Sequence, residues 1–292
     1  MSGSRKGGLI PAGLLGPGVV WLILFFIVPM YFMGEMALRS GSLASGGFAF
    51  TWEWSNFPDA LSGRGDQIIR TIYYSGAATL IALLIAYPLS YAIAFKISPK
   101  WRLLFLFAVI APFFTTYLIR TIGWKTILSD SSPIVDVLKS IGVLPDDGRL
   151  LATPAAVISG LTYNFLPFMI LPIYASLERI DLSLIEAAKD LYASASTAFR
   201  KVTLPLTAPG IVAGSLLTFI PAFGDYVNAQ ILGSPNQFMI GNRIQSLYLS
   251  DRNYPEAAAL SFLMMAAVLA VVLVYIRAAG TEAFMGEEEE AR

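Results

Sequence analysis

The sequence contains neither cysteine nor histidine. Disulfides, thiolate nucleophiles, Cys or His metal sites, His-ligated haem and a histidine general base are therefore excluded. Charge is scarce as well, because only 14% of the 292 residues are charged, against about 25% in a soluble domain. Basic and acidic residues balance at 20 each, so the chain lacks the basic excess that nucleic acid binding requires. An enzyme of this composition would depend on carboxylates, hydroxyls and amines.

Apolar residues are abundant, at 56% of the chain against roughly 45–50% in soluble domains. A hydrocarbon core about 30 Å thick is crossed by roughly 20 helical residues. Runs of that length are found at six places: 11–34, 70–95, 101–121, 154–177, 204–224 and 257–276. The segments between them are too short for a separate soluble domain. We therefore predict an all-α polytopic membrane protein, with residues 1–292 forming one domain of six transmembrane helices.

Prolines and glycines interrupt these apolar runs. Prolines lie within or at the ends of five of them, where membrane helices tolerate kinks because neighbouring helices satisfy the freed carbonyls. Gly210 and Gly214 form a small-xxx-small pair in the fifth run, which favours close packing against another helix.

Basic residues near the span ends indicate the orientation, because they are enriched in cytoplasmic loops. Lys96, Lys100 and Arg102 lie between the second and third runs, and Arg5 and Lys6 precede the first. We therefore expect cytoplasmic termini and a cytoplasmic segment 178–203, with outer loops at about 35–69, 122–153 and 225–256. The first apolar run exceeds the roughly 7–15 residues of a signal-peptide core, so we interpret it as a retained helix.

Segment 181–205 has the pattern of a surface helix. Ser183 precedes Glu186 by three residues, the spacing of a capping box, so a helix is expected to start there. Apolar positions then recur at spacings of three and four, which predicts one apolar face on one or two short helices ending before Pro205: Ile185, Ala188, Tyr192, Ala195 and Phe199. Such a segment either lies in the lipid headgroups or docks into a groove of another protein, and its mixed charges favour docking.

The same segment resembles the EAA loop of ABC importer permeases. The match consists of Glu186-Ala187-Ala188 and the aliphatic-x-Leu-Pro ending Val202, Leu204 and Pro205. Leu191 and Ala193 also fit, but Tyr192 replaces a glycine that separates two short helices in the family. A tyrosine does not readily take a positive φ, so the sequence leaves the form of this turn open.

The resemblance extends over residues 163–260. Leu166-Pro167-Phe168-Met169 and Leu171-Pro172-Ile173-Tyr174 precede the loop, and Ile220-Pro221-Ala222-Phe223-Gly224-Asp225-Tyr226 and Met239-Ile240-Gly241-Asn242 follow it. These stretches are similar to the spermidine/putrescine permease group, although permeases for iron, sulfate and other solutes share much of the pattern. The resemblance implies a type I ABC importer permease fold and polyamine transport across a bacterial cytoplasmic membrane.

The resemblance also implies a division of labour between subunits. The chain has no Gly-x4-Gly-Lys-Ser/Thr phosphate loop, so we expect it to be no enzyme and to bind no cofactor, with ATP and Mg used by partner subunits. The implied partners are two ATP-binding subunits, a second homologous permease, an extracytoplasmic substrate-binding protein and membrane lipid. The residues that would couple to the ATPase are Glu186, Ala187, Ala188, Leu191, Tyr192, Ala193, Leu204 and Pro205.

Polar residues near the outer ends of the spans are the candidates for the substrate pathway, because carboxylates and aromatic faces replace the water around ammonium groups. They are Asp225 with Tyr226, then Tyr163, Asn164 and Glu35. Arg120 would repel a polyamine unless it is paired. We interpret Trp52 and Trp54 as an interfacial aromatic belt. A secondary transporter and a polytopic membrane enzyme are the alternatives, but neither repeat symmetry nor a convergent set of catalytic residues is evident.

Overall fold

The computed structural model describes residues 9–279, so Arg5, Lys6 and the acidic run Glu287–Glu290 lie outside the described part of the chain. The chain divides into two compact units. Unit 1 contains the residues up to Arg64 together with Ile244–Met265, and unit 2 contains Gly65–Arg243 together with the residues from Ala266 onward. Both units are mainly helical, in agreement with the predicted class.

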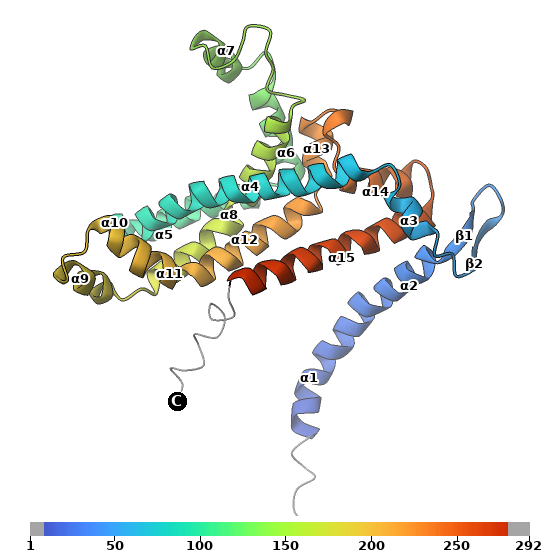
Figure 1. Ribbon diagram of the computed structural model, residues 1–292, viewed down its shortest axis with the longest axis horizontal. Helices are drawn as coiled ribbons and strands as arrows, with labels where there is room; N and C mark the ends of the chain where they lie inside the picture. Colours follow the sequence, from blue (N-terminus) through green and yellow to red (C-terminus); the bar gives the residue numbers. More distant parts are fainter. Residues whose placement is uncertain (1–8, 280–292) are drawn as a thin grey trace, which may run out of the picture. The chain divides into compact units, whose positions relative to one another are not determined.

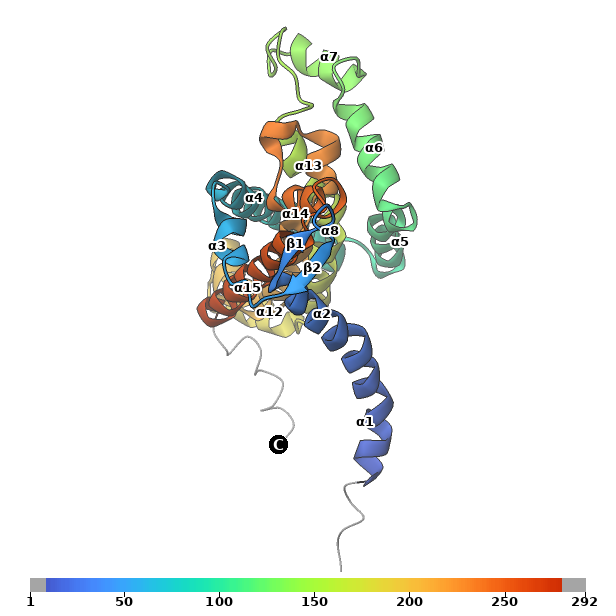
Figure 2. The same ribbon diagram turned by 90° about the vertical axis from the view of Figure 1, so that its right-hand side faces the viewer.

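Unit 1 begins with a long apolar helix and a small hairpin. Helix α1 (Leu9–Leu22) continues through a π-helical stretch at Ile23–Ile27 into α2 (Val28–Ala37). No residue from 15 to 36 is buried by the rest of the chain, so this apolar surface is available to lipid or to another subunit. Strands β1 (Arg39–Ser42) and β2 (Gly47–Phe50) then form an antiparallel hairpin, with Arg39 opposite Phe50 (Figure 2). The hairpin was not predicted, because its strands are only four residues long and rich in Gly and Ser.

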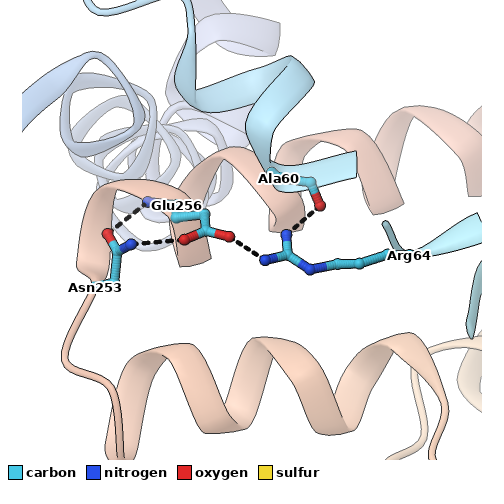
Figure 3. A network of polar contacts seen from close by, with 4 residues as sticks. All are labelled: Ala60, Arg64, Asn253 and Glu256. Carbon is cyan, nitrogen blue, oxygen red and sulfur yellow. Dashed lines mark hydrogen bonds and ion pairs between the residues drawn. The ribbon is translucent and has the colours of Figure 1, made fainter. Parts of the chain in front are cut away.

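An ion-pair network joins the end of helix α3 (Asn56–Leu61) to the start of α15 (Tyr254–Ala279) within unit 1. The Arg64 guanidinium donates to the Glu256 carboxylate and to the Ala60 carbonyl (Figure 3). The Asn253 side-chain amide donates to the other Glu256 oxygen at 2.6 Å. The Arg64 and Glu256 side chains are only 13% and 16% exposed, so each depends on the other for compensation of its charge.

The core of unit 2 is formed by three helices that pack side by side: α4 (Gly65–Tyr91), α8 (Pro154–Glu178) and α12 (Ala208–Phe223) (Figure 1). Helix α8 buries a ridge of larger side chains that recur every four residues: Val157, Leu161, Phe165, Met169, Ile173 and Leu177. Helix α4 buries a stripe of small residues: Thr71, Ser75, Ala78, Ala82, Ala86 and Ser90. Small residues allow two helix backbones to approach closely, and the Ser90 hydroxyl donates to the Ile170 carbonyl across this interface at 3.2 Å.

The third predicted span is broken in the structure. Helix α4 ends in a π-helical turn at Ala92–Lys96, and α5 (Pro99–Ile110) follows with a 3₁₀ turn at Ala111–Phe114. Residues 115 and 116 are extended, and α6 (Tyr117–Leu128) and α7 (Pro133–Ser140) continue at 97° to the preceding helix. Pro112, which carries no N–H donor, lies in the turn before the bend. The apolar run at 101–121 is therefore two helices.

The fifth predicted span is also bent. Helix α9 (Leu182–Asp190) is followed by α10 (Ala195–Ala198), a π-helical turn at Phe199–Thr203 and the short α11 (Leu204–Leu206), and α12 then begins after a bend of 62°. The expectation that the helix ends before Pro205 is wrong, because Pro205 occupies a first-turn position where its missing N–H is tolerated. The Tyr87 hydroxyl of α4 lies 2.9 Å from the Thr207 hydroxyl and ties the bend to the core.

Among the described residues, four continuous helices are long and apolar enough to cross a membrane: Leu15–Ala37, Gly65–Lys96, Pro154–Glu178 and Tyr254–Arg277. The two bent pairs raise the number to six if each counts as one span. The remaining elements are α13 (Val227–Leu232), a 3₁₀ turn at Pro235–Gln237 and α14 (Ile240–Leu249).

Candidate functional site

The EAA-like segment lies at one end of the three-helix core of unit 2, beyond the last turn of α8 (Figure 1). Helix α9 starts at Leu182, and Asp181 is its N-cap, with its carboxylate accepting a hydrogen bond of 2.9 Å from the Ser183 N–H. This bond holds the pKa of the Asp181 carboxyl below its usual value. The predicted capping box of Ser183 and Glu186 is therefore wrong, since Ser183 already lies inside the helix as the donor to the cap.

Helix α9 is followed by a turn at Tyr192, which has a φ of 60°. The Tyr192 N–H donates to the Lys189 carbonyl at 2.9 Å, and the Ala193 N–H donates to the Ala188 carbonyl at 3.0 Å. This pair of bonds is the Schellman motif, in which the residue after the helix is usually glycine. Tyr192 therefore makes the turn that the glycine of the family would make. A left-handed backbone at a residue with a side chain costs roughly 1–2 kcal/mol.

The predicted coupling residues are displayed on the surface at this end of the bundle. Glu186, Ala187, Leu204 and Pro205 are exposed, and Ala188 and Ala193 are half-buried. The Leu191 side chain is 83% exposed and that of Tyr192 is 98% exposed. The prediction that Tyr192 shares an apolar face with Ile185 is wrong, because the helix ends before Tyr192.

A buried polar cluster lies toward the opposite ends of α8 and α12. Asp225, which follows the last turn of α12, is 8% exposed. One of its carboxylate oxygens accepts a hydrogen bond from the Tyr117 hydroxyl of α6, and the other accepts from the Asn228 N–H of α13 at 2.8 Å. Both oxygens are thus engaged within the chain.

The cluster continues into α8. The Asn164 amide donates to the Asn228 side-chain oxygen and to the Thr121 hydroxyl, at 3.2 Å each. The Asn164 oxygen is buried and has no hydrogen-bond partner among the described residues. We call these five residues the polar junction: Tyr117, Thr121, Asn164, Asp225 and Asn228.

The sequence prediction included Asp225 and Asn164 but missed Tyr117, Thr121 and Asn228. A local signal existed only for Asn228, because an aspartate three residues ahead of it at a helix start is a typical cap for its N–H. The other two belong to α6, and their contacts connect positions more than 40 residues apart in the sequence.

The side chains of the remaining pathway candidates have other surroundings. Tyr163 stacks on Trp124, with ring centroids 5.2 Å apart, and the Tyr226 side chain is 40% exposed. The Arg120 guanidinium lies over the rings of Phe113 and Tyr117, at 4.7 and 5.7 Å from their centroids. The aromatic faces thus compensate part of its charge.

Glu35 belongs to unit 1 and is not part of this cluster. One of its carboxylate oxygens pairs with Arg39 at 2.6 Å. Glu35 lines a cavity of about 710 Å³ together with Trp52 and Trp54, whose side chains are each 62% exposed. Because Arg39 already neutralises Glu35, this cavity is mainly an aromatic surface.

Comparisons with known proteins identify the family. Residues 12–280 match the family described as "Binding-protein-dependent transport system inner membrane component". The chain is 39% identical over 259 residues to the spermidine/putrescine transport system permease protein PotB of Haemophilus influenzae, covering 88% of this chain and 90% of the relative. It is 36% identical to PotB of Escherichia coli strain K12, covering 89% and 94%.

A solved structure shows the same fold. The bacterial alginate ABC transporter, in complex with an alginate pentasaccharide-bound periplasmic protein, contains a chain that superposes with a TM-score of 0.73 at 19% identity, covering 95% of this chain and 96% of that one. The similarity therefore includes both units of the protein. The chain belongs to the family of binding-protein-dependent transport system inner membrane components, the permease subunits of ABC importers.

Proposed function

We propose that this permease imports polyamines of the spermidine and putrescine class across a bacterial cytoplasmic membrane. The relatives at 39% and 36% identity are named for these substrates and match the chain over most of its length. The chain itself is a membrane protein and not an enzyme, because in its family ATP hydrolysis belongs to a separate subunit. ATP and Mg would therefore be bound by that subunit.

The coupling role rests on one observation: a helix capped at both ends is displayed at the surface with none of its residues buried by its own chain. A nine-residue helix is marginal in water without packing. Docking into a cleft of the ATP-binding subunit would supply that packing. Ala187 and Ala188 allow a close approach, and Glu186 offers an exposed carboxylate for a polar contact.

The fold connects this helix to the polar junction. The EAA-like segment runs through the bend at Thr207 directly into α12, whose other end leads to Asp225. Helix α8 likewise connects the start of the segment to Asn164. Movement of the segment by the ATP-binding subunits would thus be transmitted along two packed helices. Alternating access would require these helices to have two stable arrangements.

The assembly would contain two ATP-binding subunits, a second homologous permease and an extracytoplasmic substrate-binding protein. The apolar surface of residues 15–36 provides an area for the second permease or lipid. The substrate-binding protein would contact the outer loops, with both termini and α9 on the cytoplasmic side. Within unit 2, the substrate pathway would use Asp225, Tyr226, Tyr163 and Asn164 as its polar residues.

The function can be tested with the two permeases and the two ATP-binding subunits assembled in nanodiscs. We expect ATP hydrolysis to rise when a spermidine-loaded binding protein is added, and Glu186→Lys to abolish this stimulation by reversing the charge at the docking surface. The matched control is Lys100→Glu, which reverses an exposed charge in the predicted cytoplasmic turn between the second and third runs, outside the EAA-like segment, and should leave stimulation unchanged.

The outcomes separate the parts of the proposal. Stimulation by a binding protein loaded with another solute, but not with spermidine, would contradict the substrate and leave the coupling role intact. Full stimulation in Glu186→Lys would contradict the coupling role of α9.

A further inference from the structure

Tyr192 combines a left-handed backbone with a fully displayed side chain. Its backbone has a φ of 60°, a conformation that residues with a side chain adopt at a free-energy cost. Its side chain is 98% exposed, so no packing of the ring within the chain compensates that cost. Strained residues of this kind persist where they serve a function. Since the side chain points away from its own chain, that function would be a contact with another molecule.

The Schellman bonds fix the backbone from which this side chain projects. The Tyr192 and Ala193 N–H groups donate to the Lys189 and Ala188 carbonyls at 2.9 and 3.0 Å. The tyrosine ring is therefore projected from a hydrogen-bonded turn, next to a Leu191 side chain that is 83% exposed. Two neighbouring apolar side chains held on a rigid turn are typical of an anchor at a protein interface, where Tyr is enriched.

The charge of the segment around Tyr192 indicates whether the tyrosine contacts a protein or the lipid surface. Segment 181–192 carries three acidic residues, Asp181, Glu186 and Asp190, and one basic residue, Lys189. The cytoplasmic leaflet is anionic and attracts basic segments, so it disfavours this acidic one. A protein cleft with an apolar pocket and a basic rim is complementary to it.

We propose that Tyr192 is an aromatic anchor that inserts into an apolar pocket of the ATP-binding subunit, and that the left-handed backbone is maintained to aim its ring at that pocket. This inference rests on the proposed docking of α9. It predicts that glycine, which suits the left-handed turn best, binds the ATP-binding subunit more weakly than tyrosine does.

Glycine and asparagine substitutions test this conflict directly, because both accept a positive φ and neither has the ring. The wild-type permease and the variants Tyr192→Gly, Tyr192→Asn and Tyr192→Phe would be placed in nanodiscs. The Kd would be measured for the ATP-binding subunit that co-purifies with the wild-type chain. Hydrogen exchange of the 192 and 193 amides would report on the turn.

We expect Tyr192→Gly and Tyr192→Asn to weaken binding by at least about tenfold, as loss of an aromatic anchor does. Their cap amides should exchange no faster than in the wild type. Tyr192→Phe should bind within about threefold of the wild type, because the ring carries most of the contact area.

Two results would overturn the inference. One is unchanged binding by Tyr192→Gly while Glu186→Lys weakens binding, in which case docking stands and the anchor does not. The other is weakened binding together with faster exchange of the cap amides, which would make the effect a loss of the turn. If Glu186→Lys and Tyr192→Gly both bind like the wild type, docking of α9 itself is contradicted.

Discussion

The Tyr117 hydroxyl and the Asp225 carboxylate form a hydrogen bond between positions that are 108 residues apart in the chain. The bond joins α6, the second half of a broken helix pair, to the turn between α12 and α13. Since α12 begins at the EAA-like segment, this contact lies at the far end of the path along which we expect ATP-driven movement to travel.

The stability contributed by this contact can be measured with Tyr117→Phe. The substitution leaves one Asp225 oxygen without its donor and removes the acceptor of the Asn228 amide. Hydrogen bonds to a charged group contribute about 1.5–3 kcal/mol, so we expect thermal unfolding in detergent to shift to lower temperature by several degrees. Tyr226→Phe, at a side chain that is 40% exposed, is the control and should shift it little. Equal shifts in the two variants would contradict the assigned role of the Tyr117 hydroxyl.

The charge of Asp225 can be separated from its hydrogen bonds with Asp225→Asn. The asparagine oxygen still accepts from the Asn228 N–H, but the negative charge and the acceptor of the Tyr117 hydroxyl are lost. Comparison with Tyr117→Phe, which loses the same hydrogen bond, isolates the effect of the charge. If the carboxylate binds an ammonium group of the substrate, spermidine uptake into proteoliposomes should fall at least about tenfold, more than the loss in Tyr117→Phe. If Asp225 only holds the junction, uptake should follow thermal stability in both variants, and the substrate role would then be wrong.

Much of the membrane architecture could be predicted from the sequence, because apolar length is a local property. The runs at 70–95 and 154–177 correspond to α4 and α8 within a few residues at most ends. In the run at 101–121, Pro112 indicated a kink, but Thr115 and Thr116 are compatible with either structure, so the sequence did not predict a complete break. The bend there is a property of the folded bundle.

The site was only partly predictable for the same reason. The EAA pattern marked the correct segment, yet both caps of α9 differ from the pattern. The sequence allows either Asp181 or Ser183 to be the N-cap. Because the helix starts at Leu182, the N-cap is Asp181. The polar junction depends on which side chains of α6, α8 and α13 meet, and no local spacing encodes those contacts.

Removing one partner of the Arg64–Glu256 ion pair should lower the free energy of unfolding more than replacing both partners by apolar residues. Glu256→Ala leaves a guanidinium that is 13% exposed without its counter-charge, which should cost about 2–4 kcal/mol, slightly below the effect in a fully buried pair. Replacing both residues by methionine should cost less, because no unpaired charge remains. Thermal unfolding of the two variants, with Asp130→Ala as an exposed acidic control, would measure the difference. A double variant less stable than Glu256→Ala would contradict this account.

The close contact between α12 and α8 depends on Gly210 and Gly214, the small-xxx-small pair of the sequence. A methyl group on Gly210 would lie 2.6 Å from the Pro172 carbonyl oxygen, and one on Gly214 would lie 3.0 Å from the Met169 carbonyl oxygen. Backbone atoms cannot move aside as a flexible side chain can, so we expect Gly210→Ala to force the helices apart and cost about 1–3 kcal/mol.

Gly76→Ala is the matched control for this prediction, because it also introduces alanine into a core helix. Apart from its chain neighbours and the backbone of its own helix, no heavy atom lies within 4 Å of the added methyl group. Alanine is favoured over glycine in a helix by roughly 0.5–1 kcal/mol. Thermal unfolding should therefore move to lower temperature in Gly210→Ala and stay or rise in Gly76→Ala. Because α8 and α12 are the two helices proposed to transmit movement from α9, Gly210→Ala should also reduce the stimulation of ATP hydrolysis by the loaded binding protein. Normal stimulation in a destabilised Gly210→Ala would show that coupling does not depend on this contact.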